Sequence, residues 1–401
     1  MRKRSTPRLL AILTAAILGL GSAVTCAATA QAAPRLPTNP IGTPTYTVNV
    51  NKPGGPSGYI FYTTGWAAAV PLPVVPRGLG NTDQSAVIVD KSGRVVWRYT
   101  VAQGGSISNF RTQTYQGRKV LTWWEGSGQG GHGAGVDVIA DTRGHIIKKI
   151  TPAGLGSDVH EFRLTPDGRA LITSYHQVSA DLTSVGGPKR GTLLDCVASV
   201  VDVASGRTLT EWSALQHIPL TASAARYTGL GGAATFDPFH MNSIVLDPAG
   251  NLLISFRNLN AAYNIDARTG QILWSVGGKH SSLRMGPGTD FFGQHDVEYA
   301  DSHTIRLFDN NINVATQLGD SSIKWIRLDP TRRTATLVRR QAHPGGLATA
   351  ATGNAQAVAD GYTFGSWGTA PHISEFSPSG EMTYDATLPV GTYRAYLDTW
   401  P

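Results

Sequence analysis

Three of the eleven histidines of this chain stand at equivalent places in consecutive repeats of its sequence. His160, His240 and His295 each come just before a short strand pattern. Asn242 follows His240 by two residues, so the two side chains would project from the same face of one strand. Arg257 ends the neighbouring strand pattern. Three imidazoles, an amide and a guanidinium would form a pocket for a tetrahedral oxyanion, because arginine offers paired donors to such a group.

The same side chains favour covalent chemistry over a metal site. A neutral imidazole can act as a nucleophile while a second imidazole acts as an acid. Three imidazoles could also bind zinc, but no Asp or Glu shares the equivalent position, and the charge of Arg257 would oppose a cation. One such histidine alone would more often be a structural residue of a polar channel. Because the position is repeated, we predict a functional site, with neither a metal nor a cofactor.

A recurring hairpin pattern must position these residues. It reads apolar strand, Asp, two or three residues, Gly and a second apolar strand that often ends in Trp, most clearly in residues 86–97 and 263–274. Glycine supplies the positive φ that closes such a turn, and Asp caps it through its side chain. The turn positions, glycine or its equivalent, lie near residues 93, 144, 206, 270, 332 and 380.

A second hairpin pattern alternates with the first, most clearly in residues 162–172 and 244–254. Two hairpins make a four-stranded antiparallel unit, and the units start roughly 50 to 64 residues apart, close to common propeller repeats. Six units predict an all-β fold, a six-bladed β-propeller of four-stranded antiparallel blades. A two-sheet sandwich array would not explain one sustained period. A seventh blade remains an alternative if residues 58–80 form part of one.

The glycine-rich segment 126–135 contains His132 and lacks the lysine of a phosphate-binding loop. We therefore expect it to be a loop between blades.

The N-terminal region predicts export. Residues 1–32 combine a basic start, an apolar run and small residues, which is typical of a cleaved signal peptide. An uncleaved membrane anchor is the alternative, but the apolar run 9–20 is shorter than the ~20 residues that a span needs. We expect a secreted or extracytoplasmic protein with at most peripheral membrane contact. Residues 33–57 look like an extended Pro/Gly-rich lead-in, and residues 58–401 would form the catalytic propeller.

Charge and cysteine content narrow the function further. Residues 1–32 hold four basic residues and no acid, so their removal lowers the net charge from +7 to +3. The remaining chain has no basic stripe with interleaved aromatic residues, so nucleic acid is not expected as a partner. Cys196 is then the only cysteine, which excludes an intrachain disulfide. It lies in an apolar strand pattern and is expected to be a small buried hydrophobic residue.

The motifs around the histidines resemble the arylsulfotransferase family. The resemblance is carried by His240, by residues 254–278, by Phe291-Phe-Gly-Gln-His295-Asp and by residues 306–311, and it extends over roughly residues 85–385. It implies a six-bladed propeller that takes sulfate from a phenolic sulfate ester, holds it on a histidine and passes it to a phenol. No nucleotide donor or cofactor is implied.

By this resemblance, His295 would be the sulfated histidine, and His160, His240, Asn242 and Arg257 would match the residues that hold the sulfuryl group. Arg257 and Asn242 would balance the charge of its oxygens. His160 or His240 would protonate the departing phenolate and later deprotonate the acceptor.

The chain departs from the well-studied members of that family in two ways. Residues 33–84 leave little room for their additional N-terminal domain, and their disulfide cannot form in this sequence. Two other functions stay open. Eight-bladed quinoprotein-like dehydrogenases carry similar Asp-x-x-x-Gly-x-x-x-Trp repeats, although six units and a histidine-rich channel argue against them. A non-catalytic secreted propeller that binds a partner through its loops would not need the histidine and arginine cluster.

Overall fold

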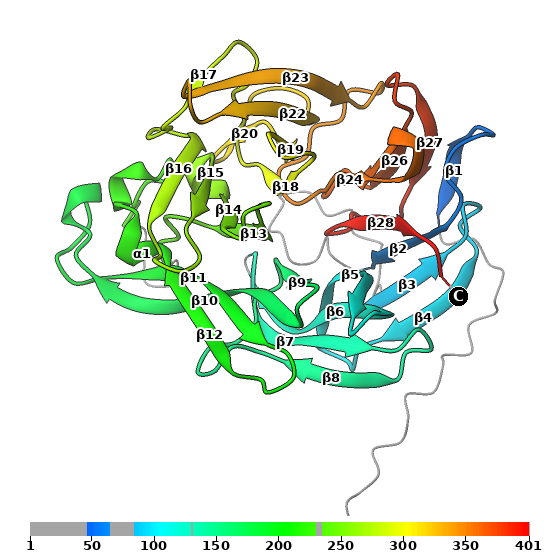
Figure 1. Cartoon of the computed structure of the whole chain (residues 1–401), viewed down its shortest axis with the longest axis horizontal. Coiled ribbons are helices and arrows are strands. Elements are labelled where there is room, and N and C mark those ends of the chain that lie inside the picture. The colour runs from blue at the N-terminus through cyan, green and yellow to red at the C-terminus, as the bar shows by residue number, and fades with distance from the viewer. Residues whose placement is uncertain (1–45, 65–83, 130, 230–234, 401) are drawn as a thin grey trace, which may run out of the picture. The chain divides into compact units, whose positions relative to one another are not determined.

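The two alternating hairpin patterns combine pairwise into antiparallel sheets. The computed structural model describes residues 46–64, 84–129, 131–229 and 235–400. Within these residues, six sheets of four or five strands surround a central channel (Figure 1). The predicted six-bladed β-propeller is confirmed.

Each blade runs from an inner strand at the channel to an outer strand at the rim. In this order, the first blade contains β28 (Ala395–Asp398), β2 (Tyr59–Thr63), β3 (Ser85–Val89) and β4 (Val95–Thr100). The second contains β5 (Ser106–Tyr115), β6 (Arg118–Gln129), β7 (His132–Ala140) and β8 (Ile146–Ile150). The third contains β9 (Phe162–Leu164), β10 (Arg169–Ala180), β11 (Gly191–Asp202) and β12 (Thr208–Ser213).

The other three blades follow the same order. The fourth contains β13 (Met241–Leu246), β14 (Leu252–Phe256), β15 (Ala261–Ile265) and β16 (Ile272–Gly277). The fifth contains β18 (His295–Tyr299), β19 (Thr304–Asp309), β22 (Ser322–Asp329), β23 (Thr334–Ala342) and β17 (Arg284–Met285). The sixth contains β24 (Gln356–Ala357), β25 (Thr363–Ser366), β26 (His372–Phe376), β27 (Met382–Thr387) and β1 (Thr47–Asn51).

Short elements occupy the connections between strands. β20 (Ile312–Asn313) and β21 (Thr316–Gln317) form a separate hairpin. The helical elements are η2 (Thr183–Val185), α1 (Ala214–His217), η3 (Leu220–Ala222), η4 (Arg257–Leu259) and η5 (Ala359–Gly361).

Strands from both ends of the chain close the ring. β28, near the C-terminus, pairs with β2 in the first blade, where Asp398 lies opposite Tyr59. β1 pairs with β27 at the rim of the sixth blade, where Thr47 lies opposite Thr387. The segment 33–57, expected to be a lead-in, thus contributes a strand to a blade. β2 likewise places residues 59–63 in the first blade rather than in a seventh. Backbone hydrogen bonds between the two ends of the chain therefore close the ring at two places, at the channel in the first blade and at the rim in the sixth. We call this region the seam.

The predicted turns between the third and fourth strands of the blades have the expected backbone. Five contain a glycine with positive φ, namely Gly93, Gly144, Gly206, Gly270 and Gly380. In the fifth blade Arg333, one residue after the predicted position, takes this conformation with φ of 52°. In the first of these turns, Asp90 Oδ1 accepts hydrogen bonds from the backbone N–H groups of Ser92 and Arg94. The turn chemistry was thus readable from the sequence.

Apolar side chains fill the space between neighbouring blades. Trp123 and Trp124 are among the largest fully buried side chains. Cys196 is fully buried, and burial raises the pKa of its thiol well above the ordinary value. Among the described residues, no helix has the length and apolar character needed to cross a membrane. The predicted signal peptide, residues 1–32, lies outside the described residues.

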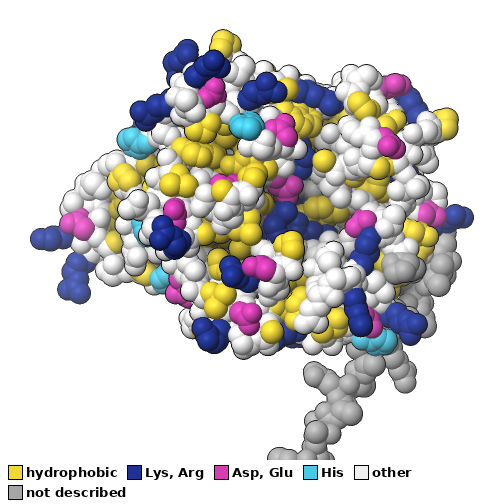
Figure 2. All heavy atoms as spheres, in the orientation of Figure 1, with side chains coloured by type: hydrophobic (Ala, Val, Ile, Leu, Met, Phe, Trp, Pro, Cys, Tyr) yellow, Lys and Arg dark blue, Asp and Glu magenta, His cyan; other side chains and the backbone are white. Residues whose placement is uncertain are grey.

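Charged side chains gather at the hollow in the centre of the ring (Figure 2). Two of the three pairs described below join different blades, and the third, between Arg306 and Glu298, joins two strands of the fifth blade. Arg111 Nη2 lies 2.8 Å from Glu161 Oε1, Arg306 Nη2 lies 2.9 Å from Glu298 Oε2, and Arg163 also pairs with Glu298. All five side chains are buried or half-buried. Such pairs need defined geometry to offset the cost of leaving water, so they fix the blades relative to one another.

Candidate functional site

The three predicted histidines stand where inner strands begin, at one end of the channel. His160 precedes β9, His240 precedes β13 and His295 opens β18. The rings of His160 and His240 have centroids 5.0 Å apart. Asn242, two residues after His240, donates to the carbonyl of Gln294, which precedes His295, at 2.7 Å. The structure therefore brings together residues that are up to 135 positions apart in the sequence.

The backbone is strained where two of these strands begin. His240 has φ of 55° and Asp296, which follows His295, has φ of 52°. Non-glycine residues seldom adopt this left-handed region, and such strain persists only where surrounding contacts impose it. At His240 the contact is local, since its N–H donates to Asp237 Oδ1 at 3.1 Å.

His295 is held as a neutral imidazole. Its Nδ1 lies 2.7 Å from Asn310 Oδ1 and 3.0 Å from the carbonyl oxygen of Gly293. The Asn310 amide nitrogen donates to two backbone carbonyls, so its oxygen must face the ring and His295 Nδ1 must carry the proton. Burial and then the charge of Arg257 lower the pKa of His295 well below its ordinary value. The lone pair therefore resides on Nε2, which accepts a long, 3.3 Å hydrogen bond from the Thr352 N–H.

His160 and His240 have carboxylate partners instead. His160 Nδ1 contacts Asp158, and His240 Nδ1 lies 2.5 Å from Asp237 Oδ2. Although burial opposes it, the charge of His160 holds the pKa of Asp158 below its ordinary value. Burial lowers the pKa of His240 to about 4, against the opposing charge of Asp237. The three rings thus differ in their Nδ1 partners: amide and carbonyl for His295, carboxylate for His160 and His240.

Two further rings belong to the cluster and were missed from the sequence. His132 Nε2 lies 3.1 Å from Asp237 Oδ2, and the His132 ring lies 4.8 Å from that of His240. Burial lowers the pKa of His132, but the hydrogen bond and charge of Asp237 outweigh it and raise the pKa. The Tyr175 ring lies 4.5 Å from His132, and its hydroxyl donates to the Met241 carbonyl. Asp237 is therefore shared by two histidines.

The prediction of an interblade loop at residues 126–135 was wrong, because this segment forms the hairpin of β6 and β7 that presents His132. Its glycines allow the two strands to lie close to Trp124. A Cβ atom at Gly133 or Gly135 would stand 2.6 Å and 2.8 Å from atoms of the Trp124 ring. The signal available in the sequence was glycine at alternate positions beside a tryptophan pair.

Arg257 opens η4 at the edge of the cluster. Its Nη1 donates to Asn258 Oδ1 at 2.9 Å and its Nη2 to the Ala350 carbonyl at 3.2 Å. Among the described residues, no carboxylate forms an ion pair with it. Burial lowers the pKa of Arg257, against the charge of Asp237, but leaves this strongly basic group cationic. Its charge is therefore available to an anion.

Asn242 is fully buried beside the same site. Its Nδ2 donates to the carbonyl of Gln294, the residue before His295, at 2.7 Å. Its Oδ1 has no hydrogen-bond partner among the described residues. Since an amide nitrogen has two hydrogens, one N–H of Asn242 remains for a ligand.

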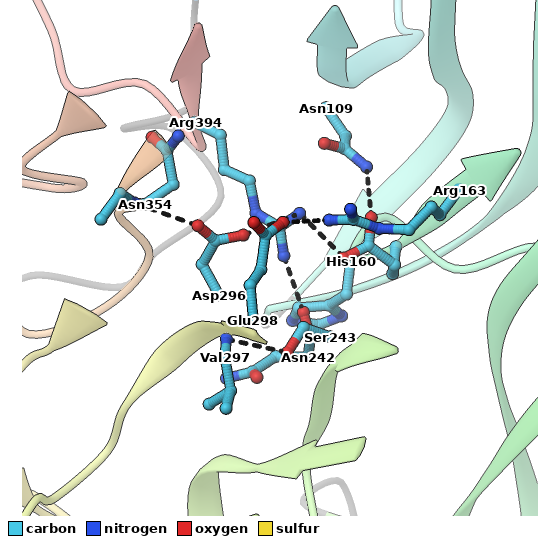
Figure 3. Close-up of polar contacts among 12 residues, drawn as sticks. Asn109, His160, Arg163, Asn242, Ser243, Asp296, Val297, Glu298, Asn354 and Arg394 are labelled. Atoms are coloured by element: carbon cyan, nitrogen blue, oxygen red, sulfur yellow. Dashed lines mark hydrogen bonds and ion pairs between the residues drawn. The ribbon is translucent and has the colours of Figure 1, made fainter. Parts of the chain in front are cut away.

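The fully buried guanidinium of Arg394 joins the three strands that carry the site (Figure 3). Its Nη1 lies 3.0 Å from Glu161 Oε2 and 3.5 Å from Asp296 Oδ1, and its Nη2 donates to the Asn242 carbonyl at 2.9 Å. Glu161 follows His160, and Asp296 follows His295. Arg394 itself precedes β28, the strand that closes the ring, so ring closure and site geometry are linked.

Within the part of the chain that the structure describes, two groups of side chains could hold a metal ion. Asp237, His132 and His240 offer three ligand atoms within 4.8 Å of one another. The sequence argument against zinc did not foresee this carboxylate. The second group combines His343, which follows β23 of the fifth blade, with His372 and Asp385 of the sixth blade.

The second group is better described as a hydrogen-bonded cluster. The Gly345 N–H donates to His343 Nδ1 at 2.9 Å, which leaves the ring proton on Nε2. That nitrogen faces Asp385 Oδ1 at 3.2 Å, so it donates a hydrogen bond instead of offering a lone pair to a metal.

Comparison with known proteins identifies a family for most of this chain. A family model described as Arylsulfotransferase (ASST) matches residues 111–388. A search of curated proteins finds no match.

Solved structures with similar folds are distant in sequence. A protein of unknown function from Bacteroides caccae has 15% identity and a TM-score of 0.47, covering 82% of this chain and 93% of its own. The Cps50 (Swd1) β-propeller domain of Myceliophteria thermophila has 14% identity and a TM-score of 0.43, with 88% and 89% covered. The periplasmic gluconolactonase PpgL of Pseudomonas aeruginosa has 13% identity and a TM-score of 0.42, with 80% and 82% covered. At these values the similarities carry no argument about function.

The contacts of Arg394 predict a pH-dependent loss of stability in Arg394→Met. Removing one partner of a buried ion pair costs about 3–5 kcal/mol at pH 7. In the wild type Arg394 holds the pKa of Glu161 below its ordinary value, so its contribution is present above pH ~4.3 and is lost as pH falls through the lowered pKa. In the variant, Glu161 would be protonated more readily.

The difference in unfolding free energy between wild type and Arg394→Met should therefore be smaller at pH 4 than at pH 7, measured by urea denaturation. Arg94→Met is the matched control, because Arg94 makes an exposed ion pair with Asp90 at 2.9 Å and should cost less than about 1 kcal/mol. Equal losses for the two variants at pH 7 would contradict the role given to Arg394.

Proposed function

We propose, since this chain belongs to the arylsulfotransferase family, that it moves a sulfuryl group from a phenolic sulfate ester to a phenolic acceptor through a sulfohistidine on His295. No nucleotide donor is needed. The observation that carries the proposal is the difference in Nδ1 partners among the three histidines. Only His295 has its Nδ1 proton held by uncharged acceptors, the side chain of Asn310 and the carbonyl of Gly293, which leaves a neutral ring with a lone pair on Nε2.

In the first step, Nε2 of His295 would attack the sulfur atom. A nitrogen–sulfur bond forms, the bond from sulfur to the aryl oxygen breaks, and the phenolate leaves with the electron pair of that bond. The ring becomes cationic, and its Nδ1–H continues to donate to Asn310 and to the Gly293 carbonyl. The long hydrogen bond from Thr352 N–H must be released, and this donor can then serve a sulfuryl oxygen.

Arg257 and Asn242 are suited to the negative oxygens of the transferring group. Arg257 has no carboxylate partner among the described residues, and its backbone N–H donates to the carbonyl of His240, a member of the cluster, at 2.8 Å. Asn242 has one free N–H next to the backbone that carries His295. Preorganised donors of this kind stabilise developing charge strongly in a buried site.

Two histidines would divide the proton transfers. His160 contacts Asp158 through Nδ1, and we assign to its ring the transfer of a proton to the departing phenolate. His240 shares Asp237 with His132, whose positive charge lowers the pKa of His240 further. His240 is therefore neutral at pH 7 and suited to accept the proton of the incoming phenol. The phenol oxygen then attacks sulfur, and the electron pair of the bond between nitrogen and sulfur returns to Nε2 of His295. The proton taken up by His240 then passes to His160, whose ring centroid lies 5.0 Å away, or exchanges through solvent, so that both rings return to their starting states.

We also propose that the protein is located outside the cytoplasm after removal of residues 1–32.

The sequence leaves two alternative functions open. An eight-bladed quinoprotein-like dehydrogenase does not fit six blades. A non-catalytic binding propeller remains the other outcome of the experiments below.

The first experiment supplies a chromogenic aryl sulfate with and without an added phenol. With donor alone, the wild type should release about one phenolate per enzyme and gain one SO₃ group on His295, detected by peptide mass spectrometry. With phenol present it should turn over with ping-pong kinetics. His295→Asn should lower turnover by about 10³-fold or more, because the covalent step is lost.

The control for that variant is His145→Asn, which changes an exposed histidine on the turn between β7 and β8. It should leave turnover unchanged. Transfer without an adduct, or undiminished turnover in His295→Asn, would show that His295 is not the nucleophile. No transfer with any phenolic donor would favour a binding propeller.

A second experiment tests the shared carboxylate through the pH profile of kcat/KM. If neutral His240 is the base, activity should fall in acid as His240 is protonated, near pH 4 in the wild type. His132→Asn removes a positive charge that lowers this pKa and frees Asp237 for His240. The acid limb should therefore move to higher pH in His132→Asn. An acid limb that stays in place would mean that His240 is not the base or that His132 is uncharged.

A third experiment concerns metals. The proposal assigns the charge of the transferring group to Arg257, so activity should survive exhaustive treatment with a chelator. Metal analysis should find less than stoichiometric zinc in active enzyme. Stoichiometric zinc that is lost together with activity, and whose uptake is abolished in His132→Asn, would replace this mechanism with a metal-assisted one.

A further inference from the structure

A cavity of about 770 Å³ lies beside η4. Its volume is within the range of small-molecule sites in proteins. The lining residues that matter below are Val185, Arg226, Tyr227, Lys279, Asn313 and Val314. None of these residues has a role in the transfer described above.

The topology places this cavity at the same end of the channel as the catalytic cluster. In a four-stranded antiparallel blade, the start of the first strand, the turn between the second and third strands and the end of the fourth strand share one edge. The histidines stand at the starts of first strands. The cavity is formed by η2, by the β20–β21 hairpin and by segments that follow the fourth strands β12 and β16.

Direct contacts connect the cavity wall to Arg257. The Ala224 N–H donates to the Asn258 carbonyl at 2.8 Å. The side chain of the same Asn258 accepts the hydrogen bond from Arg257 Nη1. On the other side of η4, Asn260 Nδ2 donates to Asn313 Oδ1 at 3.1 Å. The cavity and the proposed sulfuryl site therefore lie against the same short helix.

The cavity is electropositive. Its charged lining residues are Arg226 and Lys279, and no acidic residue lines it. Lys279 Nζ donates to the backbone carbonyls of Thr221 and Ser223, which are neutral. Among the described residues, neither Arg226 nor Lys279 forms an ion pair. Two cations without a carboxylate favour an anionic ligand.

The cavity also exposes apolar side chains that a bound ligand could cover. Val185, Tyr227 and Val314 contribute apolar or aromatic surface. Val314 is 41% exposed and has φ of 58° at the tip of the β20–β21 hairpin. A β-branched residue in this conformation is an outlier, because glycine or asparagine would occupy such a turn at lower cost. An exposed, strained valine on a cavity wall is the arrangement expected where a ligand packs against it.

We propose that this cavity binds the far end of an aromatic acid, a phenol or phenyl sulfate whose carboxylate is remote from the reacting oxygen. This inference rests on the proposed sulfuryl transfer and adds a substrate class to it. The ring would pack against Tyr227 and Val314, and the carboxylate would lie near Arg226. The reacting oxygen would extend past η4 towards Arg257 and His295.

The experiment compares two acceptors with the same biphenyl frame, 4-phenylphenol and 4′-hydroxybiphenyl-4-carboxylate, of which only the second carries a carboxylate at the far end. Arg226→Gln should raise KM for the carboxylate on the order of fivefold, as expected for a partly exposed ion pair, and leave KM for 4-phenylphenol unchanged. Val314→Ala should raise KM for both acceptors, because it removes apolar contact and not charge. Arg268→Gln is the matched control, since Arg268 is an exposed arginine on the β15–β16 turn outside the cavity. It should change neither value.

Equal KM changes for the two acceptors in Arg226→Gln, or no change in either, would overturn the proposal while leaving sulfuryl transfer intact. If no acceptor is sulfated, the proposed function fails. Binding of the biphenyl carboxylate to each variant is then measured by calorimetry instead of KM. Binding that is weakened in Arg226→Gln and not in Arg268→Gln would still support the cavity as an aromatic-acid site. Equal binding by wild type and Arg226→Gln would reject it.

Discussion

The guanidinium of Arg394 lies out of water between strands of three blades, and the geometry of the site depends on it. It contacts Glu161 and Asp296, each next to a histidine of the cluster, and the backbone of Asn242. A buried charge of this kind adds little net stability compared with apolar packing, but it strongly penalises arrangements in which a partner is displaced. Because Arg394 immediately precedes β28, these contacts form only when the C-terminal strand has closed the ring. The geometry of the candidate site is therefore completed by the last strand of the chain.

Within this frame, small differences in hydrogen-bond partners give equivalent histidines different chemistry. An amide and a carbonyl hold the proton of His295 on Nδ1 without adding negative charge, so the ring stays neutral and its Nε2 keeps a lone pair. Carboxylates at the same position of His160 and His240 stabilise a protonated ring. For His240 this effect is divided, because His132 competes for Asp237. Position in the blade brings the rings together, and the second partner of each ring decides its role.

The sequence predicted those parts of the molecule that repeat locally. Turn glycines such as Gly270 and the alternating apolar strands report their own backbone conformation, so blade number and the common phase of the three histidines could be inferred. The hydrogen-bond partners of the histidines carried no such signal, because they lie in irregular backbone or in another blade. Asp158 and Asp237 lie two and three residues from their histidines in irregular backbone, and His132 enters from another blade in a glycine-rich hairpin. The exchange of strands β1 and β28 at the seam is likewise a long-range pairing. Family resemblance supplied the expected roles of the histidines, which the residues alone left open.

The closed ring also explains how the site tolerates backbone strain. His240 and Asp296 adopt left-handed conformations that cost on the order of 1–2 kcal/mol each. Each has a compensating contact: the His240 N–H is capped by Asp237, and the Asp296 carboxylate accepts the Ala355 N–H at 3.0 Å and faces Arg394. The contact of His240 comes from the segment just before its own strand, whereas those of Asp296 come from the sixth blade and from the residue before the closing strand. Relaxing Asp296 therefore requires neighbouring parts of the ring to move. The same contacts hold the imidazoles a few ångströms apart and keep the carboxylates from moving to pair with Arg257. The charge of Arg257 therefore remains available to bind an anion from solvent.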